Sequence, residues 1–230
     1  MTRRTLLWLA CISTVAGCAT APPKERAAPS AVAASAAVAQ LVASEPETFK
    51  MVHQVVARYA GQTYPMNGYL LGRRDGSFRV SAMLPVGPKL FDVAKVSGRW
   101  ESRIHLAEAA ARVDPLEVGH AVDRIYFRWA DGPLVFEEGA WVTRQPMSGE
   151  DVDVVEVWRS PADLSVFRKR FFRKGRPVLD IAYDKRELIQ GQTIARFVRL
   201  TDARGFTLEL SVTDYQPGFP VPDARLRLGD

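Results

Sequence analysis

The sequence predicts a mainly β protein in which a curved antiparallel sheet surrounds one central helix. The first observation is that short segments of alternating apolar and polar residues, separated by turn signals, fill residues 46–216. The second is one stretch in the middle of the chain, residues 115–128, whose apolar residues recur at helical spacing. About ten strands make a sheet that is too curved to stay flat, so the sheet either closes or cups something.

The N-terminus has the pattern of a secretory signal. Arg3 and Arg4 precede the apolar run TLLWLACISTVAG, residues 5–17, which ends in small residues. A membrane-spanning helix needs about 20 apolar residues, so this run is too short to be one. The tetrapeptide VAGC, which ends at Cys18, resembles the lipobox of bacterial lipoproteins. We therefore expect residues 1–17 to be a lipoprotein signal peptide and Cys18 to be lipidated; the alternative is a plain secretory signal.

This prediction decides the cysteine chemistry of the mature chain. Cys11 would leave with the signal and Cys18 would be blocked by lipid, so no free thiol, disulfide or thiolate metal site would remain. Loss of Arg3 and Arg4 lowers the formal net charge from +5 to +3. Resemblance to known lipoproteins also implies that Ala19, next to the anchor, favours export to the periplasmic face of the outer membrane.

Residues 18–45 are rich in Ala, Pro and Ser and contain almost no large apolar side chains. A segment of this composition contributes little to a hydrophobic core. It is typical of a tether that holds a domain at a distance from the membrane. The Ala-rich part, residues 31–43, could instead form a helix when docked. We expect a lipidated tether over 18–45 and one folded domain over 46–216.

The first half of the domain reads as a β-meander. Turn signals such as Gly61-Gln62, Asp75-Gly76 and Ser97-Gly98 separate its alternating segments. The predicted strands are residues 49–59, 64–72, 78–84, 90–96 and 100–106.

The predicted helix has its own start signal. Asp114 is an N-cap candidate and Pro115 suits the first helical position. Val118, Val122 and Ile125 follow at helical spacing, so one side of the helix is apolar.

Strands resume after a long loop. Residues 130–152 carry several Gly, Pro and acidic residues and predict a loop with at most one short strand. The tail, residues 217–230, contains Pro220 and Pro222 and cannot pair as a central strand, so we expect it to be extended. The predicted later strands are residues 154–158, 164–173, 177–183, 193–201 and 206–213.

The order of these parts resembles the LolA/LolB group of periplasmic lipoprotein carriers, and most of all LolB-like outer-membrane lipoproteins. Three stretches carry the resemblance: SFRVSAMLPVGPKLFDV at 77–93, DPLEVGHAVDRIYF at 114–127, and residues 171–215 with the final strands. The resemblance implies an incomplete, or half, β-barrel with the helix as a plug or lid. It also implies a cavity that binds acyl chains.

A cavity for acyl chains needs inward-facing apolar side chains, because lipid recognition is largely burial of apolar surface. An ordinary filled core would use the same residues, and the sequence leaves both alternatives open. The candidate lining residues are Phe78, Val80, Leu84, Phe91, Val93, Trp100, Ile104, Val118, Val122 and Ile125.

Other clusters favour ordinary structural roles. The run RKRFFRKGR, 168–176, could contact anionic headgroups, but a solvated hairpin whose aromatic residues alternate into the core is the better interpretation. His53, His105 and His120 lack metal-ligand spacing, and EDVDVVE at 150–156 lacks the pattern of a calcium loop. No hydrolase, zinc-protease or phosphate-loop motif occurs, so we expect no catalytic residue, metal or cofactor.

These features predict a non-enzymatic, membrane-anchored protein that holds acyl chains of lipids or lipoproteins during envelope transport. Its expected partners are acyl chains, the outer membrane and a periplasmic carrier, and nucleic acid is not expected. One alternative is an accessory lipoprotein for a specific acylated product, such as an aryl-polyene-type lipid. Another is a structural envelope lipoprotein with a solid core that binds no lipid.

Overall fold

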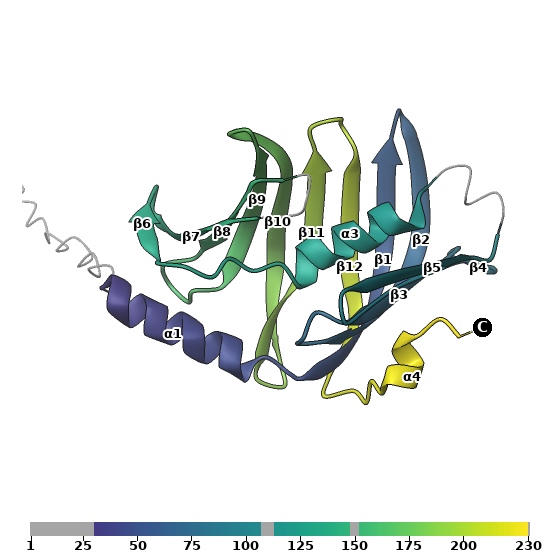
Figure 1. Cartoon of the computed structure of the whole chain (residues 1–230), viewed down its shortest axis with the longest axis horizontal. Coiled ribbons are helices and arrows are strands. Elements are labelled where there is room, and N and C mark those ends of the chain that lie inside the picture. Colours follow the sequence, from purple (N-terminus) through teal and green to yellow (C-terminus); the bar gives the residue numbers. More distant parts are fainter. Residues whose placement is uncertain (1–29, 107–112, 148–151, 230) are drawn as a thin grey trace, which may run out of the picture.

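The computed structural model describes residues 30–106, 113–147 and 152–229. In these residues, twelve antiparallel strands form one strongly curved sheet that does not close into a barrel (Figure 1). The half-barrel and its mainly β content are therefore as the sequence predicts. The strands are β1 (Thr48–Tyr59), β2 (Gln62–Arg73), β3 (Phe78–Met83), β4 (Lys89–Val96), β5 (Arg99–Ile104), β6 (Val135–Glu137), β7 (Ala140–Pro146), β8 (Val154–Arg159), β9 (Val166–Arg173), β10 (Arg176–Ile189), β11 (Gln192–Asp202) and β12 (Thr207–Pro217).

Sequence neighbours pair throughout the sheet, except at its centre. The strand order is β5-β4-β3-β2-β1-β12-β11-β10-β9-β8-β7-β6, so the first and last strands meet in the middle. Their register includes Val55 opposite Leu210 and Met51 opposite Tyr215. The sheet therefore has two halves, each a meander, joined by the β1–β12 pair.

Several hairpins use a two-residue turn that ends in glycine. Ser97 and Gly98 have φ of 48° and 79°, and Lys174 and Gly175 have φ of 50° and 72°. Positive φ at both positions is the type I′ geometry, which matches the right-handed twist of the flanking strands. The sequence predicts both of these turns, because glycine adopts the second conformation at no steric cost.

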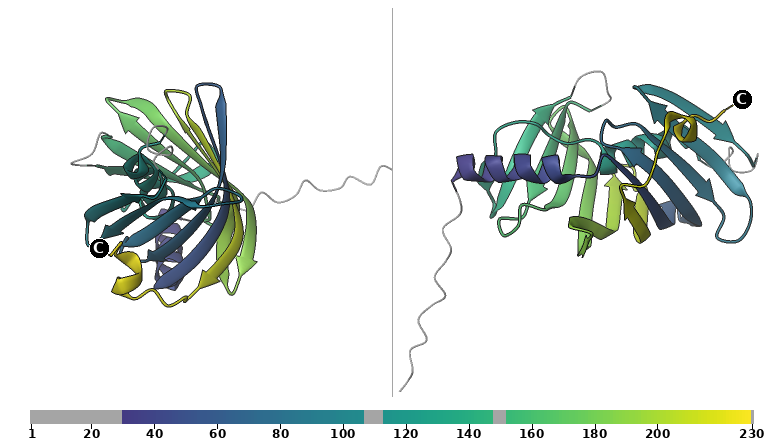
Figure 2. Two further views of the ribbon diagram at one scale, coloured as in Figure 1. Left: turned by 90° about the vertical axis from the view of Figure 1, so that its right-hand side faces the viewer. Right: turned by 90° about the horizontal axis from the view of Figure 1, so that it is seen from below.

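Alternation along the strands divides the sheet into a concave and a convex face. Buried side chains such as Phe78, Val80 and Phe91 point to the concave face and form the main core. Helix α3 (Pro115–Tyr126) lies across this face, as Figures 1 and 2 show. Its position inside the cup confirms the central helix that the apolar spacing predicts.

The Ala-rich segment within the predicted tether is a helix, α1 (Ala31–Ser44), which lies along one end of the half-barrel (Figure 1). The hydroxyl of Ser30 caps it by accepting a hydrogen bond from the Ala33 amide. Ala34 is almost fully buried against Leu134 and Trp141. Tertiary packing thus stabilises a helix where composition alone favours a tether. The predicted signal peptide and Cys18 lie outside the described residues.

The tail is packed rather than merely extended. It contains a short helix, α4 (Asp223–Leu226), whose Leu226 is completely buried. Arg79 of β3 donates to the carbonyl oxygens of Arg225 and Arg227, at 3.4 and 3.3 Å. Because Arg79 alternates with the inward-facing Phe78 and Val80, these contacts place α4 on the convex face.

The region predicted as a long loop contains two strands. β6 and β7 form a hairpin around Glu138-Gly139, and β7 pairs with β8, with Val142 opposite Trp158. This pairing extends the sheet to its second edge. No helix of the described ranges is long and apolar enough to cross a membrane.

Candidate functional site: an apolar cavity beneath the central helix

Helix α3 forms for local reasons that the sequence displays. The Asp114 carboxylate accepts a hydrogen bond of 2.9 Å from the Leu116 amide, and Pro115 occupies the first turn. The apolar side of the helix faces the sheet and includes Val122 and Ile125, both buried. The N-cap fixes where the helix begins, and the apolar stripe fixes which side of it faces the concave side of the sheet.

A cavity of about 600 Å³ lies between this helix and the concave face. Its walls are mostly aliphatic, with contributions from β1, β2, β3, β11, β12 and α3. This volume falls within the range of about 300–1,000 Å³ that is typical of small-molecule sites. Apart from the aromatic residues at its rim, the apolar lining side chains are Val55, Ala57, Met66, Leu70, Val80, Ala82, Val113, Val118, Ala121, Val122, Val152, Val178, Leu179, Leu200, Leu208 and Leu210.

One polar pair lines the cavity among these aliphatic residues. Nε2 of His53 lies 2.7 Å from the hydroxyl of Tyr126, which connects β1 to the end of α3. Burial lowers the pKa of His53 to about 4, although a hydrogen bond to the Gly68 backbone opposes this shift. The imidazole is therefore neutral near pH 7. Gly68 lies opposite His53 in the ladder.

Charged and aromatic residues line the cavity at two neighbouring hairpins. Tyr59 and Tyr64 come from the β1–β2 hairpin, and Arg204 and Phe206 from the β11–β12 hairpin. Arg204 is mostly exposed and forms an ion pair of 2.8 Å with Asp202. The cavity therefore has an aliphatic interior and an amphipathic rim.

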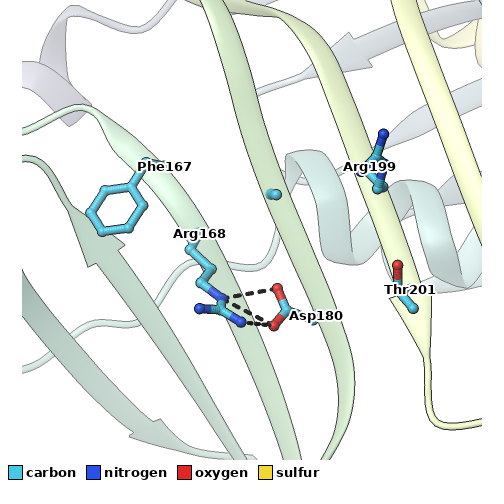
Figure 3. Close-up of a pocket in the computed structure, with 6 residues that line it drawn as sticks. Phe167, Arg168, Asp180, Arg199 and Thr201 are labelled. Atoms are coloured by element: carbon cyan, nitrogen blue, oxygen red, sulfur yellow. Dashed lines mark hydrogen bonds and ion pairs between the residues drawn. The ribbon is translucent and has the colours of Figure 1, made fainter.

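The convex face has a second, shallow depression (Figure 3), which is separate from the cavity. It is lined by residues of β9, β10 and β11, including Arg168, Asp180 and Arg199. Arg168 Nε donates to both carboxylate oxygens of Asp180, at 3.0 Å each, and Arg199 forms an ion pair with Glu209. These polar groups already satisfy one another, so we place the candidate site in the concave cavity.

The predicted lining residues fall into three groups. Val80, Val118 and Val122 line the cavity. Phe78, Phe91, Val93 and Ile125 are buried in the core around it, and Trp100 packs against the helix. Leu84 lies in the loop between β3 and β4, and Ile104 is 45% exposed on the edge strand β5.

Two polar residues that sequence reasoning treats as ordinary are buried. His53 alternates in phase with the buried Met51 and Val55, which was the available signal. Lys169, in the basic run 168–176, alternates in phase with Phe171, and both are fully buried. Among the described residues, no cluster of His, Cys, Asp and Glu could hold a metal ion.

Lys169 is buried beneath the end of α3. Its ammonium nitrogen donates to the carbonyl oxygens of Arg124 and Ile125, at 3.1 and 2.9 Å, and lies 3.8 Å from the centre of the Trp129 ring. Burial and the nearby Arg159 guanidinium lower the pKa of Lys169 well below its usual value. This side chain therefore holds the helix to β9 at some electrostatic cost.

Comparison with known proteins identifies the fold. No protein-family model and no curated protein matches the sequence. The structure is similar to a DUF1329 family protein from Desulfovibrio piger, with a TM-score of 0.63 and 13% identity over 86% of this chain and 97% of that one. It is also similar to a LolA superfamily protein from Nitrosomonas europaea, with a TM-score of 0.59 and 12% identity over 84% and 97%.

A third similar structure is a putative outer membrane lipoprotein-sorting protein domain from Vibrio parahaemolyticus. Its TM-score is 0.53, with 11% identity over 85% of this chain and 97% of that one. Together these likenesses show that the chain has a LolA/LolB-like fold, which confirms the resemblance seen in the sequence.

Proposed function

We propose that this protein binds the acyl chains of lipids or lipoproteins and holds them in the cavity beneath α3 during transport in a Gram-negative envelope. The observation that carries the proposal is the cavity itself, about 600 Å³ in volume and mostly aliphatic. An aliphatic surface of this size recognises a ligand by burial, which contributes about 0.8 kcal/mol for each methylene group. Two of the similar structures, a LolA superfamily protein and a putative outer membrane lipoprotein-sorting protein domain, support the same class of cargo.

Binding and release would then depend on a small difference between two apolar environments. A bilayer interior buries an acyl chain about as well as an apolar cavity does, at roughly the same 0.8 kcal/mol per methylene group. The direction of transfer would follow the supply of cargo at each membrane or carrier. Such a cycle needs binding and no bond chemistry, so a carrier is favoured over an enzyme.

The proposed location rests on the N-terminal pattern. Lipid on Cys18, within the predicted lipobox, would hold the protein at the periplasmic face of the outer membrane. A Cys18→Ser variant should leave the membrane fraction. Metabolic labelling with an alkyne fatty acid should mark the wild type and not this variant. Labelling of both would refute the assignment of Cys18.

Native mass spectrometry of the protein, purified in a mild detergent, tests the cargo. The wild type should carry a non-covalent fatty acid or phospholipid that is lost on denaturation, whereas lipid on Cys18 would remain attached. Ala121→Trp, which places a large ring in the cavity, should abolish this adduct. Ala182→Trp, on the exposed convex face, is the matched control and should retain it. A wild type without any adduct would instead favour the structural lipoprotein.

A further inference from the structure

The cavity beneath α3 is bounded by a helix that several strands hold in place. One contact comes from near an edge of the sheet, where Lys95 of β4 lies 2.7 Å from the Asp123 carboxylate. A second comes from the centre of the sheet, where His53 of β1 lies 2.7 Å from the Tyr126 hydroxyl. Two come from the other side, where Lys169 of β9 and Tyr183 of β10 both donate to the Ile125 carbonyl oxygen, at 2.9 and 2.7 Å. All four contacts meet the last turn of α3.

These strands lie far apart in the sheet. β4 is the second strand from one edge, β1 is central, and β9 and β10 belong to the opposite half. The end of α3 therefore ties both halves of the sheet together as well as closing over the cavity. Because a buried hydrogen bond that is broken leaves its partners without water to replace it, lifting the helix or spreading the sheet would break several such contacts at once and is unfavourable.

The first half of the helix is fixed by close packing. A side chain on Gly119 would lie 2.7 Å from Cγ1 of Val93 and 2.8 Å from the Trp100 ring, so the helix backbone rests directly on β4 and β5. The ring of His120 lies tilted beside the Trp100 ring, with 4.5 Å between their centres. At the helix C-terminus, the Phe127 ring lies parallel to that of Phe78, 5.1 Å away. Close packing therefore holds the middle of the helix and its C-terminal end against the sheet.

The capacity of the cavity is therefore close to its observed volume. A methylene group is about the size of a water molecule, whose share of liquid volume is about 30 Å³, so 600 Å³ accommodates on the order of 20 methylene groups. That number corresponds to one long acyl chain. A two-chain phospholipid or a triacylated lipopeptide would leave at least one chain outside in water.

Resting on the proposed function, we infer that the cavity takes one acyl chain at a time and selects single-chain amphiphiles, such as a fatty acid or a lysophospholipid, over two-chain lipids. The amphipathic rim at Tyr59, Tyr64 and Arg204 then surrounds the polar end of the cargo. The neutral His53–Tyr126 pair adds a hydrogen-bonding group to the mostly apolar wall of the cavity.

The test is a competition measured by native mass spectrometry on the detergent-purified protein. Palmitoyl lysophosphatidylcholine and dipalmitoyl phosphatidylcholine share a headgroup and differ in chain number, and they are offered together at equal concentration. We expect one lysolipid per protein and at least about tenfold less of the two-chain lipid, a difference of about 1.4 kcal/mol. Equal binding, preference for the two-chain lipid, or two lysolipids per protein would overturn the inference while leaving lipid binding intact. Binding of neither lipid would overturn both proposals.

A pair of tyrosine variants tests the role of the fixed helix. Tyr183→Phe removes one hydrogen bond to the Ile125 carbonyl without changing the aromatic ring, and should reduce the discrimination at least about threefold, which corresponds to one weakened hydrogen bond. Tyr69→Phe, at a partly exposed position on β2, is the matched control and should leave the discrimination unchanged. Unchanged discrimination in Tyr183→Phe would show that the anchored helix does not set the capacity.

Discussion

The ammonium group of Lys169 donates a hydrogen bond of 2.9 Å to the carbonyl oxygen of Ile125, at the last turn of α3. This contact attaches the central helix to β9, and it does so with a side chain that has no exposed surface. A cation near the C-terminal end of a helix is favourable for the helix dipole, but burial opposes the charge. The two effects make the stability of this region dependent on pH.

Replacement of this lysine should change the pH dependence of folding. Because burial holds the pKa of Lys169 well below 10.5, the unfolded chain binds a proton that the folded protein lacks over the interval between the two pKa values. The unfolding free energy of the wild type should therefore rise, relative to Lys169→Met, as the pH increases toward 10.5. Urea unfolding of both proteins at about pH 7 and about pH 9.5 measures the difference. A constant difference would mean that Lys169 is protonated in both states.

A second pH effect should arise at the cavity wall. The pKa of His53 falls from 6.5 to about 4 on folding. At a pH between these two values, His53 is therefore protonated in the unfolded chain and neutral in the folded protein. Acidification across this interval should reduce the unfolding free energy by about 3 kcal/mol. His53→Gln, which keeps a polar side chain near Tyr126 but does not titrate, should lose less stability. Parallel unfolding curves for the two proteins from pH 7 to pH 4 provide the comparison.

Gly119→Ala should destabilise the protein although alanine is the better helix former. Helix propensity alone favours Ala by about 1 kcal/mol. The added methyl group, however, would lie 2.7 Å from Val93 and 2.8 Å from Trp100, so the helix must move away from β4 and β5. Overpacking of this kind typically costs about 1–3 kcal/mol, and thermal unfolding should show a lower midpoint. A higher midpoint would indicate that α3 is loosely seated, which would also weaken the argument for a fixed cavity.

Asp92→Asn should loosen the convex face of the first half-sheet. The buried Asp92 carboxylate accepts hydrogen bonds from Arg79 at 3.0 Å and Lys89 at 3.1 Å and lies 2.8 Å from the His105 ring nitrogen. Without the negative charge of Asp92, the Arg79 and Lys89 side chains lie close together with no carboxylate between them. The substitution should lower the free energy of unfolding by about 2–4 kcal/mol.

The same substitution should also weaken the attachment of the C-terminal segment. Because Arg79 also donates to the carbonyl oxygens around α4, residues 221–229 should exchange their amide hydrogens faster in the variant. Hydrogen exchange read by mass spectrometry separates this local effect from global unfolding. Unchanged exchange in 221–229 would show that α4 is held independently of Asp92.

Local signals made the fold predictable. The Asp114-Pro115 start, the spacing of Val118, Val122 and Ile125, and the glycine-containing turns each act within a few residues of the chain. The sequence left residues 31–43 open between a tether and a docked helix. It could not decide between them, because the stability of α1 comes from burial of Ala34 against Leu134 and Trp141, which lie about 100 residues away.

The candidate site was predictable only in part, because alternation gives the face of a residue and not its neighbours. Val80 and Phe91 point to the same face, yet Val80 lines the cavity and Phe91 lies in the packed core. Ile104 alternates like a core residue but belongs to β5, which is an edge strand of the sheet formed by the described residues. Lys169 carries a charge that normally indicates an exposed position, and contacts that the sequence does not reveal, with two carbonyl oxygens of α3 and the Trp129 ring, make its burial possible.

The central pairing of β1 with β12 has a consequence for how the chain reaches its native state. β1 begins at Thr48 and its partner β12 ends at Pro217. Almost the whole domain must therefore be synthesised before β1 and β12 can pair. Until then β1 and β11 each present an unpaired edge, which is a hazard for association with other chains. Such long-range closure slows spontaneous folding. In the exported protein that we propose, late pairing of β1 with β12 would keep the polypeptide unfolded long enough to pass through a translocation channel.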